Sequence, residues 1–187
     1  KEKPNAYFLG MGDYDDLAST SDRKILNSSE LHDFTKQTLD DTYRQRCNDL
    51  LKEISFMKKS MIGLIEGNHY GIFSDSNITT TQYMCQKLGC KYLGVSSFIR
   101  LSFIYGSKKA CIDIWAHHGK GASRGVGGSL NTVEQMGEIS TADILLMGHD
   151  HKKSVALKNR LSLTWGHGLN LTNKKVLMAR TGSFLRG

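Results

Sequence analysis

The sequence predicts a protein of the α/β class, and three observations support that prediction. In the first half of the chain, short apolar runs alternate with stretches of helical periodicity, an order typical of parallel strands that share one sheet. In the second half, strand-like runs follow one another more closely. Polar residues that can bind metal ions come directly after several apolar runs, and open α/β sheets carry their sites where strands end.

The first half contains three predicted strands and two predicted helices. Between residues 29 and 59, apolar side chains recur three and four positions apart, which gives a helix with one apolar face. A second, shorter helix ends at Gly89. Strands are expected over residues 7–11, 61–65 and 91–93, and helices over residues 29–59 and 79–88. Strands separated in this way by helices are expected to pair in parallel.

The second half is mainly strands. Two strands over residues 98–105 and 110–116 are joined by a tight turn at residues 106–109, which predicts a hairpin. A glycine-rich loop over residues 119–128 leads into a short helical stretch. The remaining elements are this stretch, over residues 132–136, and strands over residues 144–147, 154–157, 161–165 and 176–179.

Composition is that of an ordinary globular protein. The 187 residues are 39% hydrophobic and 23% charged, enough for one domain with a substantial core. No apolar run approaches the ~20 residues of a membrane span, and no secretory leader opens the chain. These observations bound the compartment only weakly; we favour the cytoplasm and leave the localisation open. The four cysteines are scattered, and we expect reduced core thiols. The net charge of +7 favours anionic partners, including nucleotides and nucleic acid.

Three short polar segments and one histidine pair carry the chemistry that the sequence offers. Each follows an apolar run, so each places oxygen or imidazole ligands where a buried strand ends. They are Gly12-Asp13 with Asp16, Gly67-Asn68-His69, His117-His118 and Gly148-His149-Asp150-His151. Together they predict a dinuclear metal site.

The residue types suit that chemistry. The carboxylate of Asp13 has two oxygens with which to bridge two cations, and Asn68 adds a neutral oxygen beside the imidazole of His69. On an extended backbone, His149 and His151 would face one side, as two ligands of one site should. Neighbouring strand residues face opposite sides, so His117 and His118 should not both bind, and we favour His117.

These segments, in this order, resemble the motifs of the calcineurin-like metallophosphoesterase superfamily. The family's ordered motifs are D-x-H, G-D-x-x-D, G-N-H-D/E, a lone His and G-H-x-H, and all but the first have a counterpart between residues 7 and 184. The resemblance implies a two-sheet sandwich flanked by helices. It also leads us to expect one domain over residues 1–187 that lacks its first strand, and it leaves open a truncation at the C-terminal end. A degenerate, one-metal or inactive relative is the alternative.

The resemblance also implies a role for each residue. Asp13 would bridge the two metals, with Asp16 supporting the site, and His69 would act as general acid toward the leaving group. His151 would bind the first metal. The ligands of the second metal would be Asn68, His149 and one of His117 or His118.

The implied activity is phosphoester hydrolysis by a metal-activated water, with two divalent ions that could be manganese, iron or zinc. We expect a phosphodiesterase, with a nucleotide or nucleic acid as the possible substrate. The other hypotheses are a protein phosphatase, a non-catalytic binding module on the same fold, and a basic nucleic-acid binder whose histidines are incidental.

Basic residues near the predicted site are candidates for substrate binding. Lys120 and Arg124 lie in the glycine-rich loop after the histidine pair and could hold a phosphate, although a solvated loop explains them equally well. Tyr70 stands where the family usually has a carboxylate, which weakens the expectation of efficient catalysis. His167 could be structural or could touch the substrate, and we favour the structural role.

Overall fold

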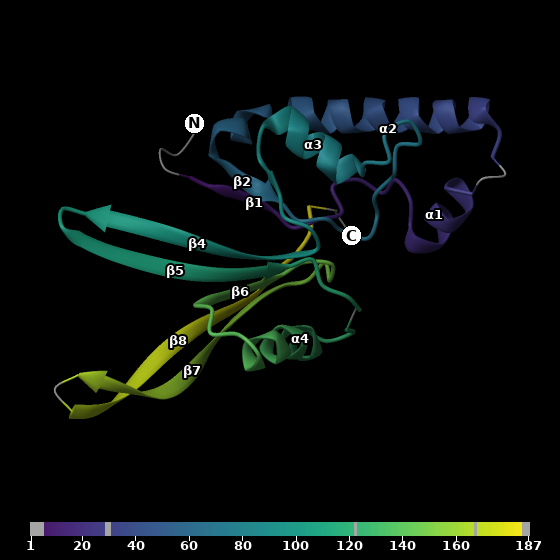
Figure 1. Cartoon of the computed structure of the whole chain (residues 1–187). Coiled ribbons are helices and arrows are strands. Elements are labelled where there is room, and N and C mark those ends of the chain that lie inside the picture. Colours follow the sequence, from purple (N-terminus) through teal and green to yellow (C-terminus); the bar gives the residue numbers. More distant parts are fainter. Residues whose placement is uncertain (1–5, 29–30, 122, 167, 185–187) are drawn as a thin grey trace. The chain divides into compact units, whose positions relative to one another are not determined.

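The computed structural model describes residues 6–28, 31–121, 123–166 and 168–184, and it confirms the mixed α/β class (Figure 1). The chain forms two compact units, Lys1–Val95 and Ser96–Gly187. The first unit contains a three-stranded sheet and the second a five-stranded sheet. The expected single domain over residues 1–187 therefore stays a prediction.

The sheet of the first unit is parallel, as the alternation of strands and helices predicted. Its strand order is β1-β2-β3, and both pairs run in parallel. The strands are β1 (Phe8–Gly10), β2 (Met61–Leu64) and β3 (Lys91–Tyr92). The helices are α1 (Thr20–Leu26), α2 (Asp33–Glu53), the 3-10 helix η1 (Ser55–Ser60) and α3 (Thr80–Leu88).

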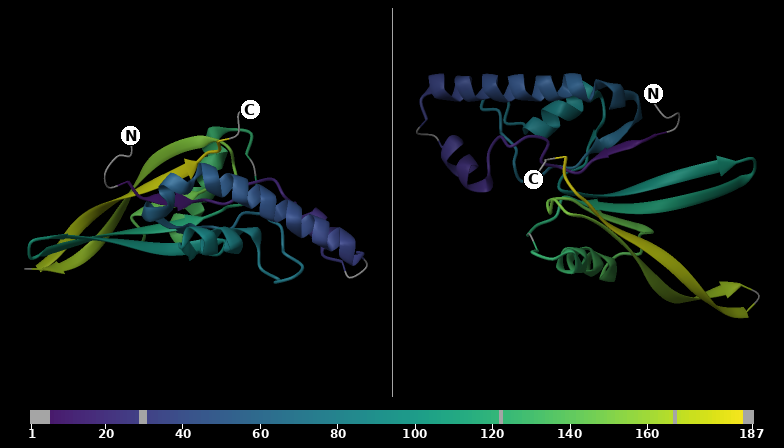
Figure 2. Two further views of the ribbon diagram at one scale, coloured as in Figure 1. Left: turned by 90° about the horizontal axis from the view of Figure 1, so that it is seen from above. Right: turned by 180° about the vertical axis from the view of Figure 1, so that it is seen from behind.

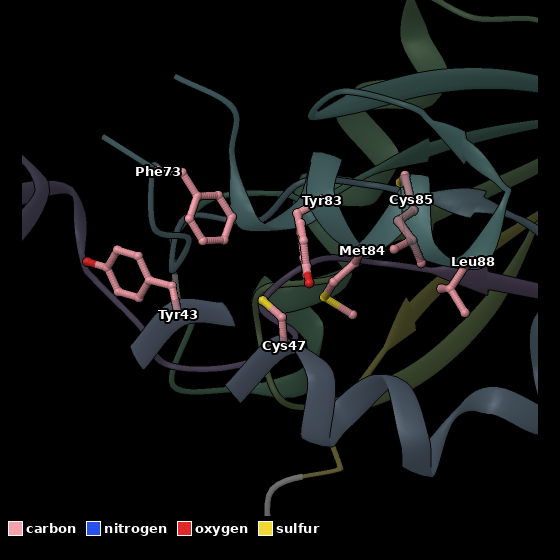
Figure 3. Close-up of a cluster of buried hydrophobic side chains, with 8 residues drawn as sticks. Tyr43, Cys47, Phe73, Tyr83, Met84, Cys85 and Leu88 are labelled. Carbon is pink, nitrogen blue, oxygen red and sulfur yellow. The ribbon is translucent and has the colours of Figure 1, made fainter. Parts of the chain in front are cut away.

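The core of the first unit lies among α2, α3 and β2 (Figure 3). The helical periodicity predicted that α2 would turn one apolar face inward, and two residues of that face, Tyr43 and Cys47, are buried. The buried residues of this core are Tyr43, Cys47, Leu64, Phe73, Tyr83, Met84, Cys85 and Leu88. Burial raises the pKa of the Cys47 thiol to about 12, which fits a packing role rather than a reactive one.

Both ends of α3 follow from local sequence. The Thr79 hydroxyl accepts a hydrogen bond from the Gln82 amide at 3.1 Å, and the Gln82 side chain accepts one from the Thr79 amide at 2.8 Å. This capping box satisfies two amides that the first turn leaves unpaired. Gly89 ends the helix with a φ of +68°, in the left-handed region that glycine favours.

The Thr79 cap gives a first testable expectation. Thr79→Ala should lower the free energy of unfolding of the first unit by about 1 kcal/mol, because the hydrogen bond from the Gln82 amide to the Thr79 hydroxyl is lost. Hydrogen exchange of peptides from α3 would measure it. Thr42→Ala is the matched control, since Thr42 is exposed in the middle of α2 and alanine is a better helix former there. Equal effects of the two substitutions would contradict the capping role.

The second unit contains a mixed sheet with one helix on it. The strand order is β4-β5-β6-β8-β7, with the central pairs parallel and the two outer hairpins antiparallel. Helix α4 lies against one face of this sheet (Figure 2), where Val133 and Met136 pack in a buried cluster with Leu145 and Val176. The elements are β4 (Ser96–Tyr105), β5 (Lys108–His117), α4 (Val126–Glu138), β6 (Ile144–Met147), β7 (Lys153–Gly166) and β8 (Gly168–Thr181).

Two boundaries in this unit differ from the prediction. The strands expected at residues 154–157 and 161–165 are one strand, β7, because β8 pairs with it along its whole length. Two of the polar residues between them face α4: Lys158 pairs with Glu134 at 2.8 Å, and Arg160 donates to carbonyl oxygens at the end of α4. Helix α4 begins at Val126, inside the predicted glycine-rich loop, and not near residue 132.

Two smaller findings concern the cysteines and membranes. Cys111 is exposed on β5, so the prediction of a core thiol is wrong there, while Cys47 and Cys85 are buried as expected. Across the described ranges, we find no helix with both the length and the apolar character that crossing a membrane requires.

Candidate functional site

The structure brings together the first two polar segments of the sequence. After β1 the chain reverses at Gly12 and Asp13, whose φ values are +97° and +50°. Asp tolerates this left-handed conformation better than most residues. One carboxylate oxygen of Asp13, Oδ1, accepts the backbone N–H groups of Asn68 at 2.8 Å and His69 at 3.0 Å. Residues far apart in sequence thus form one turn-to-turn contact at the strand ends of the first unit.

Gly67 makes this contact possible. A Cβ on Gly67 would lie 2.0 Å from the Asp13 carboxylate oxygen and 2.3 Å from the Asp13 amide nitrogen. Neither atom is the end of a long flexible side chain that could move aside, so only glycine fits at this position. The glycine before Asn68 is therefore a steric requirement of the contact with Asp13.

His69 has a carboxylate partner. Its Nδ1 lies 2.6 Å from Oδ1 of Asp16. A carboxylate beside Nδ1 favours the tautomer in which Nδ1 carries the proton. Nε2 is then the nitrogen that can interact with another group. The His69 side chain is 33% exposed, so a molecule in solution can reach it. The expected role of Asp16 in supporting a metal site stays a prediction.

Within the second unit, His118 and His149 lie side by side. His118 follows β5, is 3% exposed, and its Nε2 lies 3.3 Å from Nδ1 of His149. The two rings meet edge to face, with centroids 5.2 Å apart. Sequence reasoning favoured His117 over His118, but the structure brings His118, and not His117, to His149.

His117 forms a hydrogen bond with a residue of its own segment. Its Nδ1 accepts the amide of Gly119 at 2.6 Å, which shapes the chain after β5. Burial, together with the neighbouring His118, Lys120 and Arg180, lowers the pKa of His117. A neutral imidazole is the form that accepts such a bond.

His149 and His151 do not share one side of an extended backbone, so that expectation is wrong. His149 has a φ of +63°, a left-handed conformation, where the chain turns sharply after β6. His149 is half-buried and His151 is exposed. The expectation required an extended backbone, because alternation of side chains holds only for extended residues.

Asp150, between these histidines, is the buried member of the segment. It is 3% exposed, and its Oδ2 accepts a 2.6 Å bond from the Ser129 hydroxyl while Lys152 donates to Oδ1 at 3.1 Å. Although burial alone would raise the pKa of Asp150, these two bonds outweigh it and lower the pKa to about 2. The carboxylate therefore ties the segment to α4.

Arg180 completes this attachment. This buried guanidinium donates to the carbonyl oxygens of Ser129 at 2.9 Å and Gly148 at 2.7 Å. Burial lowers the pKa of Arg180, and the Asp150 carboxylate opposes that effect. Sequence reasoning missed Arg180 and the burial of Asp150. The position of Asp150 between two histidines could have pointed to its role, whereas the residues around Arg180 gave no such signal.

The basic loop residues divide into two kinds. Lys120 and Arg124 are exposed, and their predicted binding of substrate stays a prediction. Lys152 instead donates to the Ser123 carbonyl at 2.5 Å as well as to Asp150, so it holds the glycine-rich loop in place. His167 lies outside the described residues.

Comparison with known proteins does not identify the chain. No protein-family model, curated protein or solved structure matches it. A function therefore has to be argued from the residues and their geometry.

Proposed function

We propose that this protein hydrolyses phosphoesters with the help of bound divalent metal ions. The observation that supports this most is the assembly of Asp13, Asp16, Asn68 and His69 in the first unit. The resemblance predicted that these two motifs act together, and the hydrogen bonds of Asp13 and Asp16 join them. A carboxylate, an amide and a carboxylate-paired imidazole at the ends of strands are suitable groups for such a reaction.

The donor set fits a divalent cation. By the resemblance, Asp13 and Asn68 would supply oxygen and His118 and His149 would supply nitrogen, a mixture that would suit manganese, iron or zinc. The proposal requires residues of both units to act on one substrate, and that requirement rests on the resemblance. Two metals are proposed, and Asp13 would be among the residues that hold them. The first metal has the weaker support, because its proposed ligand His151 is exposed and the backbone at His149 is not extended as we expected.

Each predicted site residue would have its own role in the hydrolysis. Bound metal ions would lower the pKa of a coordinated water and neutralise phosphate oxygens. His69 would donate a proton to the leaving oxygen from Nε2, because Asp16 engages Nδ1. Lys120 and Arg124 would hold the remaining phosphate oxygens.

We propose a phosphodiester as the substrate, with nucleotides or nucleic acid as the class. The net charge of +7 raises the local concentration of such anions near the protein. A protein phosphatase and a non-catalytic binding module are the competing outcomes of the experiment that follows.

The experiment combines metal analysis with hydrolysis assays. The full chain is dialysed, its metal content is measured, and hydrolysis of bis(para-nitrophenyl) phosphate and para-nitrophenyl phosphate is followed with manganese, iron or zinc added. We expect metal-dependent turnover, faster for the diester. His69→Gln should lower kcat roughly a hundredfold to ten-thousandfold, as loss of a general acid does. His32→Gln is the matched control, because His32 is exposed at the start of α2.

The outcomes separate the hypotheses. Metal-dependent turnover that is lost in His69→Gln and kept in His32→Gln supports the hydrolase. Bound metal without turnover of either ester would favour the binding module, and a phosphopeptide cleaved in preference to both esters would favour the phosphatase. If the chain binds no metal and hydrolyses neither ester, the proposal is ruled out.

A further inference from the structure

Arg23 of α1 holds the carbonyl side of the Gly-Asn-His turn. Its Nη1 donates to the carbonyl oxygens of Asn68 at 2.7 Å and Tyr70 at 3.1 Å, and to that of Ala18 at 2.6 Å. Its Nη2 donates to the Thr20 hydroxyl at 3.2 Å. One side chain thus connects the start of α1 to both ends of the short segment that contains His69.

Tyr70 is the second part of this attachment. The Arg23 Cζ lies 3.8 Å from the centroid of the Tyr70 ring, close enough for a cation–π interaction. Tyr70 is the residue that departs from the motif of the resembled family. Here it supplies a flat surface for a guanidinium, a role that lysine could not fill in the same way because its ammonium is not planar.

The turn is therefore held from both sides. The amides of Asn68 and His69 donate to Asp13, and the carbonyls of Asn68 and Tyr70 accept from Arg23. A carboxylate on the amide side and a guanidinium on the carbonyl side fix the peptide planes between them. The direction of the His69 side chain, and hence its bond to Asp16, depends on those planes.

We propose that Arg23 is a positioning residue, which holds the turn so that Asn68 and His69 stay in their working orientation. Arg23 acts through the turn and not on the substrate. The inference rests on the proposed hydrolase function for its effect on rate, but its structural part can be tested without any activity.

The test compares substitutions at Arg23 with the same substitutions at Arg44 in the full chain. Arg44 is a matched control, because it pairs with Asp75 and lies over the ring of Phe73 at 4.6 Å, on a different segment of the same unit. Arg23→Met and Arg44→Met each remove a guanidinium. Arg23→Lys and Arg44→Lys keep the positive charge but lose the planar guanidinium group. Amide exchange of Asn68 and His69 is measured by NMR, along with kcat and KM.

In Arg23→Met we expect the Asn68 and His69 amides to exchange about tenfold faster, because local opening becomes easier. The kcat should fall roughly 10- to 100-fold with KM little changed, as misplacement of reacting groups produces. Arg23→Lys should show the same changes in smaller degree, which also covers the case that the Met variant does not fold. Both Arg44 variants should leave these amides and kcat at the wild-type values.

Two results would overturn the inference. One is an unchanged exchange rate of the turn amides in both Arg23 variants, and the other is an equal change in the Arg44 variants. If the wild-type chain hydrolyses no phosphoester, the proposed function fails, and the exchange comparison alone then decides the role of Arg23.

Discussion

Gly67→Ala should break the hydrogen bonds between the Asp13 carboxylate and the turn that contains His69, and it should abolish any metal-dependent activity. The new methyl group would overlap the Asp13 carboxylate oxygen at 2.0 Å and the Asp13 amide nitrogen at 2.3 Å. Asp13 and the turn must then move apart, which breaks the bonds to the Asn68 and His69 amides. We expect the first unit to lose about 3 kcal/mol of stability, the upper range for overpacking.

The measurement for Gly67→Ala has two parts. Hydrogen exchange of peptides from α2, α3 and the turn reports the first unit, and metal titration with hydrolysis reports the site. Gly127→Ala is the control, since a Cβ on Gly127 in α4 meets nothing within 4 Å. That substitution should stabilise the helix by about 0.5–1 kcal/mol and leave hydrolysis unchanged. A stable, fully active Gly67→Ala protein would show that the contact of Asp13 with the turn is dispensable.

Asp150→Asn should destabilise the second unit by about 3 kcal/mol at neutral pH, because it breaks a buried charge arrangement. The amide can still accept from Ser129, but it cannot offset the charge of the buried Arg180 guanidinium. Lys152 would lose its ionic partner as well. Weakening this arrangement also frees the turn that contains His149.

The same carboxylate predicts a pH dependence. The pKa of Asp150 is about 2 in the folded protein against an ordinary value of 3.8, so the folded state favours the ionised form. This contribution is present above the ordinary value and disappears as the pH falls through the folded value. We expect the second unit to lose about 2 kcal/mol between pH ~5 and ~2 from this group alone. Asp150→Asn should lack that part of the loss.

Tryptophan fluorescence can measure the second unit separately. Both tryptophans of the chain, Trp115 and Trp165, lie in it, and Trp165 is exposed, so unfolding is reported mainly by Trp115. Denaturant unfolding at several pH values, with a chelator present, gives the free energies. Asp113→Asn is the control, because its pair with Arg100 is at the surface and should be worth less than about 1 kcal/mol. Equal losses in the two variants would contradict the role of Asp150.

Local patterns in the sequence determined most of the elements. The apolar runs before Gly12, Gly67 and Gly148 became the strands β1, β2 and β6, so the position of each polar segment at a strand end could be read directly. Periodicity predicted α2, and Gly89 predicted the end of α3. Helix α1 was missed, although Ser19 and Asp22 form the capping box that marks its start.

Boundaries were wrong where side chains far along the chain decided the outcome. The polar residues Lys158 and Arg160 interrupt the apolar pattern of β7, yet both bond to α4, and the strand continues through them. Gly127 and Gly128 suggested a loop but belong to α4. Glycine lowers helix propensity by only about 1 kcal/mol, which tertiary packing can outweigh.

The sequence by itself determined which residues could form a site and that each stands at the end of a strand. Only the tertiary structure decided how they are used: that His118 rather than His117 meets His149, that Asp150 is buried against Ser129, and that Arg23 holds the turn of His69. Side-chain alternation fixes that neighbours face opposite sides, but not which side faces a partner. That choice depends on hydrogen bonds and packing between segments distant in sequence, which no local pattern contains.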